Sequence, residues 1–358
     1  MNHHGVRHMS KKRECENHDA MRYNAVTKGK ITTVYNLCAD IWQEIFDYFG
    51  VVELFDTFAC IMPAADQVLF NKSEHYQLRG LTIDDDMVHL PQNINFSCII
   101  SLTIHNVHCF HIIPRCIELR SLKLIGEAEW ITCMIGKIAQ TFCKLEQLTV
   151  EISAVGSVSE ILRLVASIYS LRRLEICADR FVEDATTSSS IMAPSKIEHL
   201  IVNSCSIFDW NELPQILPRL VDIHLVSISV IDDNQKSIPS FNIHNIRTLA
   251  LGLQEVPFDW IIQLITAISN LWKLKLNGLV CEDGFVSNQR WIRLLESAPN
   301  SIHIYVNVFL QQDTRAYFNE KVKAELSDFG LSLTSSNDDE DCNMNDEDAN
   351  CWWYLRGV

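Results

Sequence analysis

The chain has few glycines and none of the glycine-based catalytic motifs. Only 12 of its 358 residues are glycine, so it offers few backbone cradles for phosphate groups. It contains neither a Gly-x-Ser-x-Gly elbow nor a Gly-x-x-x-x-Gly-Lys phosphate loop. We therefore expect a protein that is not an enzyme and that binds no cofactor.

Long hydrophobic runs and paired cysteines are also missing. No apolar run approaches the ~18 residues of a membrane-spanning helix, and the polar N-terminus lacks the apolar core of a signal peptide. The 13 cysteines include no Cys-x-x-Cys pair, and several, such as Cys60 and Cys177, stand among apolar residues. We expect these thiols to be small buried hydrophobes in a reducing compartment, either the cytoplasm or the nucleus, with no membrane contact.

Basic charge and metal-ligand spacing are lacking as well. The net charge of −15 argues against a nucleic-acid partner. The densest group of potential metal ligands is His105, His108 and His111, with Cys98 and Cys116 nearby. Alternate residues of a strand point in opposite directions, and the chain has no second ligand pair at a recognised spacing, so we expect no metal site.

The chain does contain a repeated phrase, Leu-x-x-Leu-x-Leu, in which isoleucine or valine replaces some leucines. Successive steps between copies are 26, 26, 26, 23, 26 and 25 residues, and the copies begin at Leu119, Leu145, Leu171, Ile197, Leu220, Ile246 and Leu271. Weaker copies begin at Leu78 and Ile99, and a frayed one at Ile302. A fixed period of this length predicts a solenoid, because one repeat cannot bury its apolar face without its neighbours.

Each repeat predicts a short strand followed by a return segment on the other side. The alternation in Leu-x-Leu is typical of a strand with one buried face. Several return segments have helical spacing of their apolar residues, over 131–142, over 157–169 and after Asp259. Parallel strands joined by helical crossovers give a curved α/β solenoid.

These repeats resemble the leucine-rich repeat family. The fullest match is Ile197-x-x-Leu200-x-Val202-x-x-Cys205-x-Ile207, whose cysteine is typical of the cysteine-containing variety. The resemblance implies a solenoid over residues 76–310, with about nine or ten repeats. Its concave face is formed by the strand residues between the buried leucines. On that face we expect a protein target to contact Lys123, Gln147, Arg173, Glu175, His199, Asp222, His224, Lys273 and Lys275.

The two ends of the chain differ from the repeats in composition. Residues 1–33 are basic and lack apolar periodicity, which predicts a disordered arm. Residues 311–334 are expected to form a C-terminal capping helix. Residues 335–358 are expected to be an acidic, disordered tail with an apolar end at 351–355, which either docks on the last repeat or binds a partner.

Residues 34–75 do not follow the repeat and are expected to form a short all-helical module. Leu37, Ile41, Glu44, Ile45, Phe46, Tyr48, Phe49, Glu53 and Leu54 are in register with the F-box, which this segment resembles. The resemblance implies a substrate receptor of a Skp–cullin–F-box ubiquitin ligase, which binds a Skp-type adaptor and, through it, a cullin. Contact with the adaptor is expected from Leu37, Ile41, Ile45, Phe46 and Leu54, and we expect Ile45 and Phe46 to be partly exposed before it binds.

A second interpretation keeps the solenoid and omits the ligase. In it, the N-terminal helices serve only to cap the first repeat, and the chain is a free-standing protein-binding module, an inhibitor or a scaffold. The two interpretations differ in whether residues 36–60 present an accessible apolar surface.

Overall fold

The computed structural model describes most of the chain between residues 37 and 310 and two short segments near its end. The described residues are 37–70, 77–83, 94–105, 107–141, 144–153, 158–178, 195–203, 213–229, 243–280, 285, 287–298, 302–310, 327, 331–335 and 353–357. The basic arm predicted for residues 1–33 lies outside them.

The fold is mixed α/β and is built on one sheet, whose first ten strands are parallel and follow one another in chain order. They are β1 (Leu81–Ile83), β2 (Ser101–Ile104), β3 (Ser121–Gly126), β4 (Gln147–Ile152), β5 (Arg173–Ala178), β6 (His199–Val202), β7 (Asp222–Ser229), β8 (Thr248–Gln254), β9 (Lys273–Val280) and β10 (His303–Leu310). Each predicted copy of the repeat contributes one of these strands, which confirms the period.

The strand register places the repeated leucines in rows. Leu122 is aligned with Leu148, and Leu148 with Leu174, across β3, β4 and β5. The same row continues through Leu200 to Leu274, and every member is at most 1% exposed. One face of the sheet is therefore a continuous apolar core, which each repeat completes for its neighbour.

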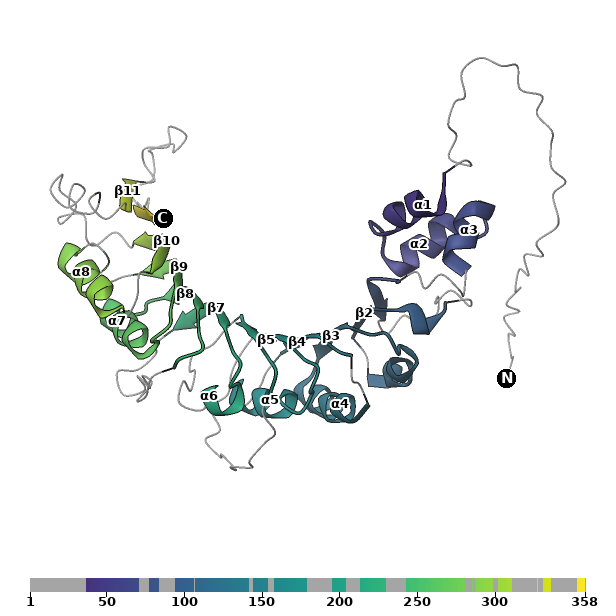
Figure 1. The fold of residues 1–358 in the computed structure, drawn as a ribbon, viewed down its shortest axis with the longest axis horizontal. Coiled ribbons are helices and arrows are strands. Elements are labelled where there is room, and N and C mark those ends of the chain that lie inside the picture. The colour runs from purple at the N-terminus through teal and green to yellow at the C-terminus, as the bar shows by residue number, and fades with distance from the viewer. Residues whose placement is uncertain are drawn as a thin grey trace, which may run out of the picture.

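Helices cover this apolar face. In Figure 1 the strands follow an arc, with the helices along its outer side. They are η2 (Phe96–Cys98), η3 (Val107–Arg115), α4 (Ala128–Thr141), α5 (Val158–Val165), α6 (Leu213–Ile216), α7 (Phe258–Ala267) and α8 (Asn288–Ser297). Helices α4, α5 and α7 confirm the three predicted from spacing, although α5 ends earlier than residue 169 and α7 begins before Asp259.

Polar side chains join one repeat to the next at the turns that precede the strands. The Ser170 hydroxyl donates a hydrogen bond to the carbonyl of Leu145 at 2.7 Å, and the Asn270 carboxamide donates one to the carbonyl of His244 at 2.6 Å. Asn245 does the same to Pro218 at 2.5 Å. All three residues come directly before the first apolar residue of a repeat, so this position satisfies backbone carbonyls that the strands do not pair.

Three short helices stand at the N-terminal end of the sheet: α1 (Ala39–Phe46), α2 (Val51–Phe58) and α3 (Pro63–Phe70). Trp42, Phe46 and Phe58 pack against one another with ring centroids 5.4–5.7 Å apart, and Phe49 contacts Phe58 at 5.2 Å. The first two helices were expected, but α3 was not. Pro63 is its first residue, a position where the missing N–H of proline costs no hydrogen bond.

The C-terminal end of the sheet differs from the expectation. Strands β11 (Leu331–Ser335) and β12 (Trp353–Gly357) are antiparallel, and β12 pairs with β10. The predicted capping helix of 311–334 is wrong for residues 331–334, while most of that range lies outside the described residues. The predicted disorder of 335–358 is wrong for 353–357. This apolar end pairs with the last parallel strand, β10, and supplies hydrogen-bond partners to its backbone groups.

Candidate protein-binding surfaces

Helix α1 carries apolar side chains on two sides, and only one side is closed. Trp42 and Phe46, four residues apart, are each 1% exposed. Ile41, also on α1, is 39% exposed, while Leu37 and Ile45 are half-buried. We name Leu37, Ile41 and Ile45 the α1 apolar row. Ile41 and Ile45 lie four residues apart and so on one side of the helix, while Leu37 precedes its N-cap residue, Cys38. Leu37 and Ile45 also pack in part against the core.

Two of the five expected adaptor contacts belong to the interior instead. Phe46 was expected to be partly exposed, but it lies in the aromatic cluster with Trp42 and Phe58. Leu54 is 1% exposed as well. The sequence could not separate the two stripes of α1, because both repeat at four residues and both are apolar. The ring of Phe58 on α2 contacts Trp42 and Phe46 and so closes their stripe.

Further apolar side chains of the three N-terminal helices and their turns are exposed, beyond the expected adaptor contacts. Tyr48 is 87% exposed, Ile61 60% and Val52 37%. Tyr48 is the second residue after α1, and Val52 lies in the first turn of α2. The helical unit formed by α1, α2 and α3 therefore presents more accessible apolar surface than the expected adaptor contacts alone.

The helical unit also packs against the first strand of the sheet. Helix α2 contacts β1, and a small gap there is lined by Phe46, Phe49, Leu54, Leu78 and Arg79. A Cβ built on Gly50 would lie 3.6 Å from the carbonyl oxygen of Gly80. The unit thus covers the N-terminal end of the apolar core while Ile41 of the α1 apolar row stays exposed.

The second candidate surface is the sheet face that the helices leave uncovered, which we call the open face. The nine expected target contacts all lie on strands, and the structure leaves each of them half-buried or exposed. Register aligns Gln147, Arg173, His199, Asp222 and Lys273 in one row. A second row holds Lys123, Glu175, His224 and Lys275.

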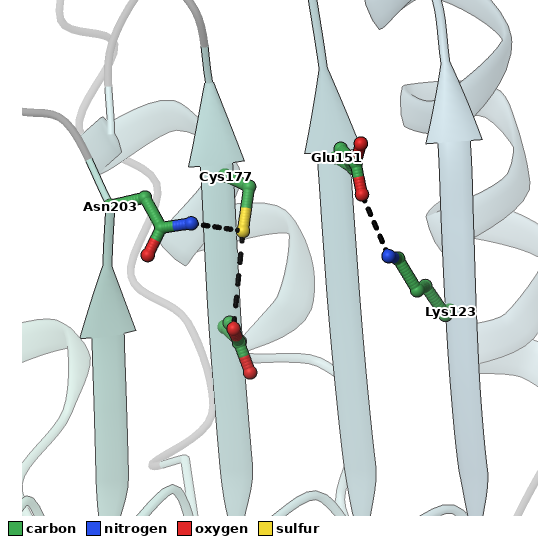
Figure 2. Close-up of polar contacts among 5 residues, drawn as sticks. Lys123, Glu151, Cys177 and Asn203 are labelled. Atoms are coloured by element: carbon green, nitrogen blue, oxygen red, sulfur yellow. Dashed lines mark hydrogen bonds and ion pairs between the residues drawn. The ribbon is translucent and has the colours of Figure 1, made fainter.

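A group of polar residues spans β3 to β6 on the open face (Figure 2). Lys123 on β3 forms an ion pair with Glu151 on β4, with 2.8 Å between the ammonium nitrogen and the carboxylate oxygen. The hydrogen bond with Glu151 raises the pKa of Lys123. Both side chains are more than 40% exposed, so solvent screens the pair and we assign it little stability.

Cys177 belongs to this same polar group and is not the small buried hydrophobe that was expected. It is half-buried, and the Asn203 carboxamide donates a hydrogen bond to its sulfur at 2.8 Å. Burial, followed by the charges of Glu175 and Glu151, raises the pKa of the Cys177 thiol. Cys60 is exposed, so that expectation fails there too.

Charged and aromatic groups continue along the open face toward the C-terminal strands. The Nδ1 atom of His199 lies 2.7 Å from a carboxylate oxygen of Asp222. Burial and then the charge of Lys275 lower the pKa of His224. The ammonium group of Lys273 lies 4.8 Å from the ring centroid of Tyr305. This mixture of both charges with aromatic rings offers side-chain contacts to a protein.

The potential metal ligands among the described residues do not cluster. Nowhere among them do three or more His, Cys, Asp or Glu side chains converge as a metal ion requires. His105 and His111 are exposed. The side chains of His108 and Cys109 lie outside the described part of the chain.

Comparison with known proteins adds no assignment. The chain matches no protein-family model and no curated protein. Within the described residues, none of the helices has the length and hydropathy needed to cross a membrane.

Proposed function

We propose that this chain is the substrate receptor of a Skp–cullin–F-box ubiquitin ligase, built as an F-box followed by a curved leucine-rich repeat solenoid. The observation that carries the proposal is the α1 apolar row, in which Ile41 is exposed and Leu37 and Ile45 are half-buried, although the neighbouring side of the same helix is closed by aromatic packing. An apolar stripe on a short helix is suited to docking against a helix of another protein.

In this proposal the two surfaces bind different partners. The α1 apolar row binds the Skp-type adaptor, with Tyr48 beside it, and the open face of the repeats holds the target. The receptor forms and breaks no bonds. It raises the concentration of the target near a ubiquitin-loaded enzyme and fixes its orientation.

The test is the affinity of the purified chain for a Skp-type adaptor, measured for the wild type and for Ile41→Asp. A carboxylate in the α1 apolar row should abolish binding, because the adaptor would have to bury an unpaired charge. Ile117→Asp is the matched control: Ile117 is 60% exposed and lies in the repeats, so this variant should bind like the wild type. Circular dichroism confirms that both variants are folded.

The result that contradicts the proposal is a wild-type chain that does not bind the adaptor, or an Ile41→Asp variant that binds equally well. Phe46→Asp is unsuitable for this test. It would place a charge inside the aromatic cluster, so loss of binding would report loss of the fold.

The packing of α2 against β1 favours a second candidate, a free-standing leucine-rich repeat module whose helices only cap the solenoid. In that case deletion of the helical unit lowers stability, and the adaptor binds neither form. The same adaptor assay therefore separates the two candidates.

A further inference from the structure

A groove of about 700 Å³ lies where the turns before β7, β8 and β9 meet. Its principal lining residues are Arg219, His244, Asn245, Arg247, Asn270 and Trp272. Each of these side chains is exposed. The groove thus combines two guanidinium groups with an aromatic surface, and it lies outside the residues expected to touch an adaptor or a target.

Some polar side chains of the groove form hydrogen bonds within the protein, and others are able to bind a ligand. The carboxamides of Asn245 and Asn270 donate hydrogen bonds to Pro218 and His244, and His244 lies 2.6 Å from the hydroxyl of Ser269. Among the described residues, neither Arg219 nor Arg247 is in an ion pair. The arginines are therefore the donors left to meet a ligand.

Cations extend beyond the groove along the same sequence of repeats. Lys196 lies 3.5 Å from the centroid of the Tyr169 ring, and the charge of Arg219 also reaches this tyrosine. On the other side Lys273 directly follows Trp272 and lies over Tyr305. Glu198 precedes the groove but does not line it. In a chain of net charge −15, this concentration of cations is a local exception.

We propose that this groove binds an acidic segment of a protein, in which carboxylate or phosphate oxyanions meet Arg219 and Arg247 and an apolar side chain packs on Trp272. The guanidinium group favours oxyanions because its planar fork of donors matches their geometry. Trp272 is 54% exposed, so contact with a ligand would remove apolar surface from water.

The spread of the cations favours an extended segment over a single small anion. Lys196, Arg219, Arg247 and Lys273 belong to four consecutive repeats, and neighbouring strands lie about 4.8 Å apart, so the row covers roughly 14 Å. An extended chain of about four or five residues has this length. Acidic residues at alternate positions along it would lie about 7 Å apart, a spacing that the long side chains of these arginines and lysines can span.

This inference adds to the proposed function, because it states the chemistry of the target protein. Only the role of the bound segment as part of a ligase target rests on the proposed function. Binding of a peptide by the groove requires no adaptor. The two claims can therefore fail separately in assays on one preparation of protein.

The experiment is fluorescence anisotropy with the full chain and labelled peptides of about ten residues, a length that exceeds the row of cations. One peptide alternates glutamate with serine, a second has glutamine for glutamate, and a third carries phosphoserine between glutamines. We expect the glutamate peptide to bind at least about 10-fold more tightly than its glutamine counterpart and to weaken as salt is added. Binding of the phosphoserine peptide alone would assign the oxyanion to phosphate and would also support the site.

The variant R219Q/R247Q should weaken binding of the acidic peptide about 10-fold or more, because it removes both guanidinium donors. The matched control is R115Q/R120Q, which removes the same charge from two exposed arginines several repeats before the groove. This control should remain within about 2-fold of the wild type, as expected for charges that act only at a distance.

Three results would overturn the proposal. They are no binding of any acidic peptide by the wild type, equal loss in the two double variants, and tighter binding of a single-stranded RNA of the same length. Adaptor binding by R219Q/R247Q should match the wild type, so a failure of the proposed ligase function would be seen independently.

Discussion

At the scale of single residues, the structure explains the lowered pKa of His224 on the open face. Burial and the charge of Lys275 both lower the pKa of His224 below its usual 6.5, and the charge of Glu175 opposes them. Register places these two charges on opposite sides of the histidine, each two strands away. Removing either charge should therefore shift the pKa in a known direction.

We predict that Lys275→Gln raises the pKa of His224 and that Glu175→Gln lowers it further, as measured by the pH dependence of the imidazole NMR signals. The lowered pKa of His224 also fixes how the stability of the fold changes with pH. The unfolded chain takes up the proton first, so the stabilising contribution is complete above pH 6.5 and is lost as the pH falls toward the lowered pKa. His224→Gln should remove this part of the pH dependence. Shifts of the same sign in both charge variants would contradict this account.

At the scale of elements, the contact between β7 and β8 depends on a glycine. The register shifts between Leu225 and Ile228, and a Cβ built on Gly252 would lie 1.6 Å from the carbonyl oxygen of Val226. That neighbour is backbone in the interior of the sheet, so it cannot turn aside as a flexible side chain would. Only glycine permits this approach of the two strands.

We predict that Gly252→Ala lowers the free energy of unfolding by about 2 kcal/mol or more, because one strand must move away from the other. Urea denaturation measures the loss. Gly136→Ala is the control: Gly136 lies within α4 with nothing within 4 Å of its built Cβ, so alanine should be neutral or stabilise by about 0.5–1 kcal/mol. Equal effects of the two substitutions would show that the close approach is not what requires Gly252.

The repeats were predictable because many copies carry the same signal. Each Leu-x-Leu phrase is weak alone, but the shared period fixes which face is buried and which strand is the neighbour, as the row from Leu122 to Leu274 shows. The exposure of the nine expected open-face residues follows from the same alternation. Whether those residues bind a target stays a prediction.

Elements that occur once were predicted less well. Helix α1 has two apolar stripes in its sequence, and only its packing shows that Phe46 is interior while Ile41 is accessible. The groove was missed because its residues come from three turns, each with an ordinary composition. Its one sequence signal is the arginine beside the first apolar residue of two successive repeats, at Arg219 and Arg247.

At the scale of the whole molecule, the fold is a linear array in which each repeat depends mainly on its neighbours. The described helical unit covers the N-terminal end of this array. At the other end, β12 pairs with β10 over Trp353–Gly357, so the last parallel strand is not an open edge. Both ends of the array are thus covered by segments that do not follow the repeat.

We predict that a chain ending at residue 352 loses hydrogen-exchange protection in β10, because the β10 amides that bonded to β12 are left facing solvent. Amides of β4, several repeats away, should keep their protection, because each repeat in such an array is stabilised mainly by contacts with adjacent repeats. A chain ending at Gly357 is the matched control and should behave like the full chain. The truncated protein should also associate at high concentration, because an unpaired strand edge is a template for another chain. Unchanged exchange in β10 would mean that β12 contributes nothing to the end of the sheet, and uniform loss across all strands would mean that the array unfolds as one cooperative unit.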